Sequence, residues 1–396
     1  MMKYCVSSSN LRKRVILVAV ACLLLTISLL MLGGMHLRGD SIIKTRRRPG
    51  AWYKLKTHKT AHPEKHTNAT VGDSLSLKTS TCEKCCYRYT TVENGVLEIR
   101  SKSELKERGC KKRLPDAIIL GVKKCGTTTL RNFLSYHPDI AFTQKELNFF
   151  TSSDRIEGLE FYRSEMVYST LDQISMEKTP AYSLHPNVPA MVKALLPDVK
   201  LIIIMRDPVE RAISDFVHVQ VTVAKHCLKQ KAFVSFISEL RNITLPKGCD
   251  FFIHSEINNT FEESVIDSNG RVKVGSQLIS RGVYVQDIQR YLEYFNPEQI
   301  LVLDGEAFIK NPYPAVKLVE QFLGVRDYFT RDHFYYEVQK GFFCLNKPIP
   351  NNCMRRAKGR PHPEVNDETL GKLRDYYRPY NKALNDLMKV DFHWSS

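Results

Sequence analysis

Several common signatures are missing from this 396-residue sequence. No internal repeat is evident, so nothing suggests a repeat architecture. No recognised nucleic-acid-binding motif is present, although the chain is basic, with 58 Lys and Arg against 42 Asp and Glu and a formal net charge of +16. A basic surface concentrates polyanions. The composition therefore favours a polyanionic partner other than nucleic acid, although part of the charge, such as residues 46–48, lies in the N-terminal part of the chain.

The usual nucleotide P-loop, G-x-x-x-x-G-K-[ST], is also missing. Residues 117–128 instead have the sequence AIILGVKKCGTT, an apolar strand followed by a basic turn that opens a helix. Gly121 and Gly126 permit a tight turn, and the first N–H groups of the helix can face an anion such as a phosphate. Lys124 precedes Gly126 and Thr127 takes the lysine's usual place, which argues against a magnesium-dependent kinase or GTPase. The alternative is an ordinary strand-turn-helix junction that happens to be basic.

A second strand-helix junction supports the anion site. Residues 199–206, VKLIIIMR, form an apolar run that is typical of a strand buried on both faces of a parallel sheet. Proline after Arg206-Asp207 suits the first position of a helix. Arg206 and Ser214 are therefore expected to face one cleft at the C-terminal edge of the sheet. The alternative is that Arg206 only pairs with a surface carboxylate.

The pattern of elements predicts an α/β fold, a central parallel sheet with helices on both faces. Part of the region 221–277 is expected to be an exposed insertion. Strands are expected near 117–121, 200–205 and 299–303, and helices near 127–136, 187–196, 208–219, 283–294 and 313–323.

These motifs, together with four further stretches in the same order, resemble the heparan sulfate sulfotransferases, most closely the glucosaminyl 3-O-sulfotransferases. The four stretches are EKTPAY at 177–182, QILVLDG at 299–305, KGFFC at 340–344 and KGRPHP at 358–363. The resemblance extends from about Leu114 to the C-terminus. It implies a P-loop-like sulfotransferase domain over 114–396 that uses 3′-phosphoadenosine-5′-phosphosulfate (PAPS) as donor and heparan sulfate or a related polysaccharide as acceptor. No metal is required, because lysines and helix N–H groups supply the positive field.

The resemblance also implies roles for individual residues. A glutamate at the position of Glu146 removes the proton from the attacking glucosamine hydroxyl, while Lys124 and Lys178 complete the catalytic set. Donor binding is implied for Lys124, Cys125, Gly126, Thr127, Thr128, Arg206, Ser214, Lys358, Gly359, Arg360, Pro361 and His362. Acceptor binding is implied for Lys123, Glu146, Asn148, Lys178 and His218.

The residues around Glu146 allow two interpretations. Desolvation by Phe149 and Phe150 would help its carboxylate act as a base near neutral pH. The alternative is a solvent-exposed glutamate at the start of a helix.

The chain departs from the 3-O enzymes at several positions. Those enzymes usually have RKGGTR where residues 123–128 are KKCGTT, and histidine and aspartate where Asn148 and Thr151 stand. The loop is closer to that of heparan sulfate N-sulfotransferases, but these normally include a large deacetylase domain that 396 residues cannot hold. The main expectation is sulfation of the glucosamine 3-hydroxyl. The alternatives are another position, including the nitrogen, another glycosaminoglycan, or a catalytically silent heparan-binding membrane protein.

The chain has one long apolar stretch, at residues 15–35, which is long enough to span a bilayer. A cleaved signal peptide is the alternative, but its apolar region is usually about 7–15 residues and no clean cleavage site follows. Basic residues flank the stretch on both sides, so the positive-inside rule gives a near tie.

Three sequons decide the expected orientation, because N-glycosylation requires a lumenal location. They start at Asn68, Asn242 and Asn258. We expect a single-pass type II Golgi membrane protein with a cytoplasmic tail over 1–14, an anchor over 15–35 and a lumenal stem over 36–113.

Eight of the eleven cysteines remain after excluding Cys5, Cys22 and Cys125, which lie in the tail, the span and the loop. A disulfide between Cys344 and Cys353 is implied by the family resemblance. A second disulfide, between Cys227 and Cys249, is left as an open alternative. The remaining four cysteines can form disulfides with one another in three ways: Cys82, Cys85, Cys86 and Cys110. A zinc site is the less favoured alternative for them, because no nearby histidine completes a recognised zinc-ligand spacing.

Overall fold

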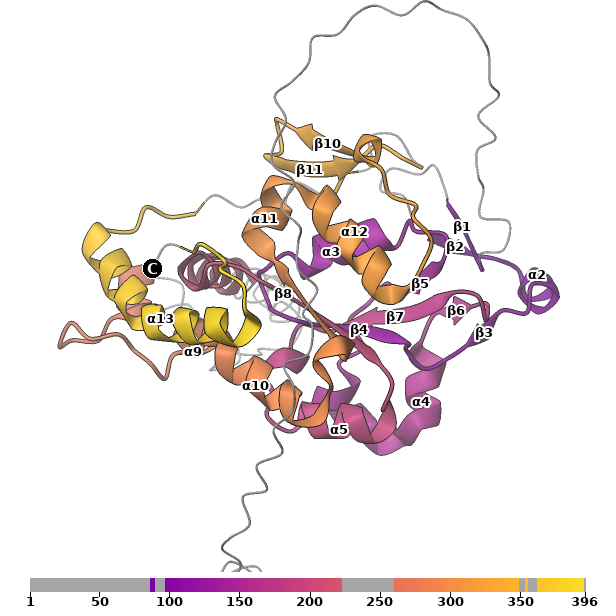
Figure 1. Ribbon diagram of the computed structural model, residues 1–396, viewed down its shortest axis with the longest axis horizontal. Coiled ribbons are helices and arrows are strands. Elements are labelled where there is room, and N and C mark those ends of the chain that lie inside the picture. Colours follow the sequence, from indigo (N-terminus) through magenta and orange to yellow (C-terminus); the bar gives the residue numbers. More distant parts are fainter. Residues whose placement is uncertain (1–85, 90–96, 223–259, 349–352, 355–361, 395–396) are drawn as a thin grey trace, which may run out of the picture. The chain divides into compact units, whose positions relative to one another are not determined.

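The computed structural model describes residues 86–89, 97–222, 260–348, 353–354 and 362–394 (Figure 1). Within these ranges, no helix is long and apolar enough to cross a membrane. The predicted span at 15–35 and the sequons at Asn68, Asn242 and Asn258 lie outside the described residues.

A five-stranded parallel sheet forms the centre of the domain, in the order β5-β7-β4-β8-β9. Its strands are β4 (Ala117–Gly121), β5 (Ile140–Phe142), β7 (Ile174–Lys178), β8 (Lys200–Met205) and β9 (Ile300–Asp304). All of β4 and nearly all of β8 are buried, as their unbroken apolar sequences predict. The prediction of these two strands and of β9 is confirmed. No clear sequence signal marks β5, which is only three residues long, or β7, which ends in the charged pair Glu177-Lys178.

Helices cover both faces of this sheet, which confirms the predicted α/β class. In Figure 1, α3, α11 and α12 lie on one side of the strands and α4, α5 and α10 on the other. These helices span Thr127–Leu134 (α3), Gly158–Glu165 (α4), Val188–Leu195 (α5), Tyr284–Tyr294 (α10), Gly305–Lys310 (α11) and Pro312–Leu323 (α12). A further helix over 208–222 follows β8, where proline at its first position was expected to start it.

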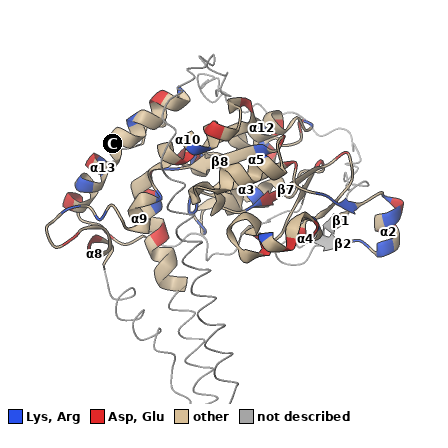
Figure 2. Cartoon of the chain, turned by 90° about the horizontal axis from the view of Figure 1, so that it is seen from below, with Lys and Arg blue, Asp and Glu red and all other residues tan. Residues whose placement is uncertain are grey.

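Further helices and strands surround this core among the described residues. The remaining helices are α2 (Lys102–Glu107), α8 (Phe261–Val265), α9 (Gln277–Ser280) and α13 (Asp367–Met388). The remaining strands are β1 (Tyr87–Tyr89), β2 (Leu97–Ile99), β3 (Lys111–Lys112), β6 (Tyr168–Ser169), β10 (Phe334–Glu337) and β11 (Phe342–Leu345). The long helix α13 packs against α10 and exposes charges of both signs along its outer surface (Figure 2).

Two disulfides lie at the edges of the domain. Cys344 and Cys353 are bonded, as the family resemblance implied. Cys86 and Cys110 are also bonded, so for these two the disulfide alternative is correct and zinc ligation is not. Cys82, Cys85, Cys227 and Cys249 lie outside the described residues.

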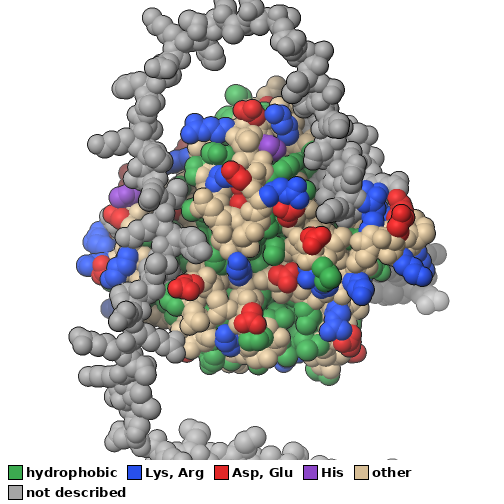
Figure 3. Space-filling view, turned by 45° about the vertical axis from the view of Figure 1, so that its right-hand side comes forward, with side chains coloured by type: hydrophobic (Ala, Val, Ile, Leu, Met, Phe, Trp, Pro, Cys, Tyr) green, Lys and Arg blue, Asp and Glu red, His purple; other side chains and the backbone are tan. Residues whose placement is uncertain are grey.

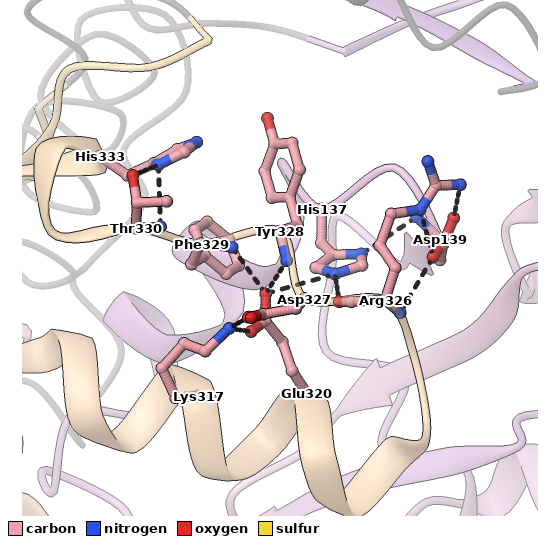
Figure 4. Close-up of polar contacts among 10 residues, drawn as sticks. All are labelled: His137, Asp139, Lys317, Glu320, Arg326, Asp327, Tyr328, Phe329, Thr330 and His333. Atoms are coloured by element: carbon pink, nitrogen blue, oxygen red, sulfur yellow. Dashed lines mark hydrogen bonds and ion pairs between the residues drawn. The ribbon is translucent and has the colours of Figure 1, made fainter.

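A set of buried hydrogen bonds positions the hairpin of β10 and β11 (Figure 4). Glu320 on α12, only 2% exposed, accepts hydrogen bonds from the backbone N–H groups of Tyr328 (3.0 Å) and Phe329 (2.8 Å). His137, just after α3, lies with Nε2 3.1 Å from the carbonyl oxygen of Arg326. These contacts satisfy the backbone of the loop that leads into β10, so the hairpin starts from a fixed point on the core.

Candidate active site

The predicted anion loop joins β4 to α3 at the C-terminal edge of the sheet. The backbone N–H of Val122 donates to the carbonyl oxygen of Ile204 at 2.8 Å, which ties the loop to β8. Gly126 is the N-cap residue of α3, adopts φ of 101°, and has no side chain to occupy the first-turn N–H groups. Glycine takes this backbone conformation without the cost that a Cβ brings. The loop therefore has the backbone geometry of an anion site.

Two loop residues contribute differently from each other. Lys124 adopts a positive φ of 78° within the turn. Cys125 is fully buried, with its Sγ 3.9 Å from the hydroxyl of Tyr284, and burial raises the pKa of this thiol to about 11. The Cys125 side chain therefore belongs to the core, and only its backbone is available to the predicted donor site.

Arg206 follows β8 beside this loop, with its carbonyl oxygen accepting from the Tyr284 hydroxyl at 3.0 Å. Its Nε donates to Glu306 on α11 at 2.8 Å, and its Nη2 lies 3.8 Å from Glu210. Arg206 thus lies at the predicted edge of the sheet and pairs with carboxylates there, while its role in anion binding stays a prediction. Ser214, the predicted partner, is half-buried on the helix over 208–222.

The start of α11 forms a close wall of the loop at Gly305. A Cβ on Gly305 would lie 2.7 Å from the carbonyl oxygen of Met205 and 3.0 Å from that of Cys125. Such distances are too short for a side chain, so only glycine lets β9 and α11 approach the loop this closely.

Lys123 and His218 were both predicted to bind the acceptor. Lys123 instead places its Nζ 3.0 Å from Oδ1 of Asp215, a fully buried carboxylate that also pairs with Arg211 and Arg281. Burial would raise the pKa of Asp215, but the neighbouring cations lower it on balance. His218 is half-buried on the helix over 208–222, one turn beyond Ser214. Lys123 therefore fixes the loop to this helix.

The predicted base lies opposite the loop. The Nζ of Lys178, at the end of β7, forms an ion pair with Oε1 of Glu146 and lies 3.4 Å from Oγ1 of Thr128 on α3. The Lys178 side chain is 4% exposed, whereas that of Glu146 is 45% exposed. One ammonium group thus connects the base to the first turn of the anion-site helix.

The expected desolvation of Glu146 by Phe149 and Phe150 is wrong. Both rings are buried, and Phe149 stacks on Tyr162 with ring centroids 4.3 Å apart. Phe149 lines the same hollow as Glu146, but the Glu146 side chain is 45% exposed and therefore keeps its contact with solvent. Glu146 agrees instead with the alternative of an accessible glutamate, and its partner is the cation Lys178.

Sequence reasoning missed the residue beneath this pair. Glu177 is fully buried and accepts from the hydroxyls of Tyr162 (2.7 Å) and Thr179 (2.8 Å). Thr179 in turn accepts the backbone N–H of Asn148 at 3.2 Å. Glu177 belongs to the EKTPAY stretch that contributed to the resemblance, and that position was the only available signal.

Two further contacts bring the C-terminal part of the chain to the site. Met354 Sδ lies 3.9 Å from Oγ1 of Thr129 on α3, and Nδ1 of His362 lies 3.5 Å from Glu210. Residues 355–361, with the predicted donor ligands Lys358, Gly359, Arg360 and Pro361, lie outside the described residues. The described residues on either side of them both touch elements of the anion site.

A hollow of about 240 Å³ opens beside the base. Its lining includes Glu146, Lys145, Phe161 and Asp154. On the face drawn in Figure 3, basic and acidic side chains are interspersed. Among the residues that the structure describes, no group of three His, Cys, Asp or Glu side chains is arranged to hold a metal ion.

Comparison with known proteins agrees with this geometry. The sulfotransferase domain family matches residues 114–387. Human heparan sulfate glucosamine 3-O-sulfotransferase 5 is 33% identical over 297 residues, which cover 74% of this chain and 78% of that protein. The chain belongs to this family of sulfotransferases.

Other relatives give the same result over similar lengths. Human heparan sulfate glucosamine 3-O-sulfotransferase 6 is 34% identical, with 72% of this chain and 75% of the relative covered. The 3B1 enzyme of Mus musculus is 36% identical over 72% of this sulfotransferase, which spans only 65% of that relative's length. A solved sulfotransferase from Alicyclobacillus acidocaldarius aligns with a TM-score of 0.47 at 20% identity, covering 70% of this chain and 97% of that one. A likeness this loose adds nothing to the assignment.

Proposed function

We propose that this chain transfers a sulfuryl group from PAPS to the 3-hydroxyl of a glucosamine in heparan sulfate. The observation that supports this most directly is the contact of Lys178 with both Glu146 and Thr128. One ammonium group thereby contacts both the proposed base and the first turn of the proposed anion-binding helix. The relatives' names supply the acceptor and the position.

The residues present fit such a donor. The first turn of α3 behind Gly126, Lys124 in the turn and Arg206 at the end of β8 offer cationic or N–H donors along one edge of the sheet. Lys358, Gly359 and Arg360 would complete the donor site from the segment that joins Met354 to His362. Bound PAPS would supply the sulfuryl group and leave as the 3′,5′-bisphosphate.

On the acceptor side, the ionised Glu146 carboxylate accepts the proton of the attacking hydroxyl while that oxygen bonds to sulfur. The bond between sulfur and the phosphate oxygen breaks, and its electron pair stays on the phosphate. Lys178 and Lys124 offset the negative charge that develops there. The exposure of Glu146 suits this role, because the acceptor must reach it from solvent.

We further propose a type II arrangement in the Golgi membrane, with the tail over 1–14, the anchor over 15–35, the stem over 36–113 and the sulfotransferase domain in the lumen. The apolar stretch, the three sequons and the two disulfides support it, since disulfides persist in oxidising compartments. Glycosidase treatment of the full wild-type chain tests the lumenal location. Single variants in which Asn68, Asn242 or Asn258 is changed to glutamine show which sequon carries a glycan. A chain that carries no glycan would contradict the lumenal location.

The activity is tested with the full chain, labelled PAPS and a panel of heparan, chondroitin and dermatan acceptors, followed by disaccharide analysis. Label at the glucosamine 3-hydroxyl supports the proposal. Label at the nitrogen or another oxygen keeps the chemistry and changes the position, an outcome that the Asn148 and Thr151 departures make informative. Heparan binding without transfer would replace the enzyme by a binding protein.

A further inference from the structure

The buried carboxylate Glu177 has no part in the chemistry described above. Its side chain is inaccessible to solvent, and hydroxyl groups donate to both of its oxygens, Tyr162 to Oε1 and Thr179 to Oε2. A buried carboxyl group costs free energy unless its hydrogen bonds are satisfied. Burial raises the pKa of Glu177, while the hydrogen bonds from Tyr162 and Thr179 lower it in part. A residue this expensive to bury calls for an explanation beyond packing.

The bond to Thr179 fixes the direction of a second bond. A threonine hydroxyl has one proton and two lone pairs. Because that proton points to Glu177, a lone pair is left to accept the backbone N–H of Asn148 at 3.2 Å. The carboxylate therefore orients the Thr179 hydroxyl, so that a lone pair faces the N–H of Asn148.

Asn148 in turn shapes the loop of the base. It adopts the left-handed conformation, with φ of 55°, which is unfavourable for most residues other than glycine, Asn and Asp. Its Nδ2 donates to the carbonyl oxygen of Glu146 at 3.3 Å. Holding the N–H of Asn148 therefore fixes the backbone two residues from the catalytic carboxylate.

Glu146 is thus attached to the end of β7 in two ways. Lys178 contacts the Glu146 side chain, while Thr179, whose hydroxyl donates to Glu177, accepts the backbone N–H of Asn148. The first attachment is an ion pair and the second is a chain of directional hydrogen bonds.

We propose that Glu177 is a positioning residue for the base: through the hydroxyl of Thr179 it holds the backbone of the Glu146 loop against β7, so that the carboxylate faces the acceptor hydroxyl. This inference rests on the proposed transferase function. A displacement of about 1 Å at a reacting group costs about 100-fold in rate, so such a support acts on kcat.

The contacts of Glu177 offer a matched control. Tyr162 donates to the same carboxylate but does not lead to Asn148. Tyr162→Phe removes one hydrogen bond of Glu177 and leaves the path through Thr179 intact. Glu177→Gln keeps the shape of the side chain, but its NH₂ group can only donate, so it cannot accept from both hydroxyls. Thr179→Val removes the hydroxyl itself.

The experiment uses the full chain and two readouts. The first is hydrogen exchange of the backbone amides over 144–152, which does not depend on turnover. Glu177→Gln and Thr179→Val are expected to speed exchange there, while Tyr162→Phe leaves it near the wild-type rate. Unchanged exchange in Glu177→Gln would overturn the inference, whether or not the chain proves to be a transferase.

The second readout is kinetic. In Glu177→Gln, kcat is expected to fall by about 10- to 100-fold while the affinity for the desulfated donor product, 3′,5′-bisphosphoadenosine, stays within about twofold. Because both variants break one path, the double variant with Thr179→Val is expected to lose little more than either alone. Equal losses of kcat in Tyr162→Phe and Glu177→Gln would show a merely structural role. A wild type that transfers nothing would refute the proposed function, and the exchange result would still decide the positioning.

Discussion

The proposed donor side and the proposed acceptor side of the site differ in what sets their geometry. On the donor side, the backbone sets the geometry: Gly126 adopts a positive φ, and Gly305 permits a close approach of α11. On the acceptor side, side-chain contacts between two segments far apart in the sequence set it: Lys178 and Thr179, at the end of β7, contact the loop that carries Glu146. A site of the first kind depends on a few glycines in fixed order. A site of the second kind depends on hydrogen bonds that form only after the sheet has assembled.

The largest expected effect separates chemistry from donor binding. Glu146→Gln removes the base and its charge but keeps its shape, so transfer is expected to fall by about 100- to 10,000-fold. The affinity for 3′,5′-bisphosphoadenosine, measured by calorimetry, is expected to stay near the wild-type value, since Glu146 faces the acceptor side. Unchanged turnover would remove Glu146 from its role.

A smaller effect is expected from the donor loop. Gly126→Ala forces a Cβ into a conformation with φ of 101° and 3.4 Å from Phe308, and such strain costs about 1–2 kcal/mol. Because the strain lies in the anion loop, affinity for the bisphosphate is expected to fall about tenfold.

Gly324→Ala is the matched control for this change. Gly324 also has a positive φ, 76°, at the end of α12, and a Cβ there would meet nothing within 4 Å. This variant is expected to lose stability without losing donor affinity. A parallel loss of affinity in both variants would show that backbone strain anywhere weakens the site.

Two of the buried carboxylates, Asp215 and Glu177, predict opposite dependences on pH. The pKa of Asp215 is lowered on balance in the fold, so its stabilising contribution is present above its unfolded value of 3.8 and is lost as the pH falls through the folded value. The pKa of Glu177 is raised above 4.5, so stability is highest below 4.5 and is lost as the pH rises through the folded value.

Urea unfolding of the Asp215→Asn and Glu177→Gln variants between about pH 3 and about pH 7 compares them. The deficit of Asp215→Asn relative to wild type is expected to grow as the pH rises, and that of Glu177→Gln to shrink. If the stability deficits of the two variants changed with pH in the same direction, the two carboxylates would not differ in their effect on the pH dependence of stability.

The smallest expected effect concerns Cys125. The thiol is buried and its pKa is raised to about 11, so little thiolate exists at neutral pH. Iodoacetamide is expected to leave the peptide that contains Cys125 unlabelled in the native chain and to label it after unfolding in urea, as mass spectrometry would show. Rapid native labelling would place the side chain in the donor site rather than in the core.

The sequence predicted the strands and the helix of the proposed donor side because their signals are local, while the donor-binding roles stay predictions. The order of Gly121, Lys124 and Gly126, the apolar run before Arg206 and the proline after it all lie within short segments, and the structure places them at one sheet edge. The pairing of Lys123 with Asp215 was not predicted, because the two residues meet only when the loop and the helix over 208–222 lie side by side.

The acceptor side was predicted only in part. Glu146 and Lys178 came from the family resemblance, but their ion pair joins residues 32 positions apart. The strand β7 escaped prediction because its last two residues are charged, and a strand with Glu177 and Lys178 does not show an apolar run. The 3₁₀ turn that directs Phe149 into the core likewise has no sequence period that would reveal it.

Under the proposed function, Lys178 has a thermodynamic consequence beyond the role proposed for it in the transfer step. Its ammonium lies within reach of Thr128 in the donor helix and of Glu146 in the acceptor loop. A negative charge bound near Thr128 competes with Glu146 for this cation, so occupation of one side changes the free energy of binding at the other. By linkage, the factor by which the donor changes acceptor affinity equals the factor by which the acceptor changes donor affinity. If the proposed function holds, heterotropic coupling between the two substrates is therefore expected from this single side chain.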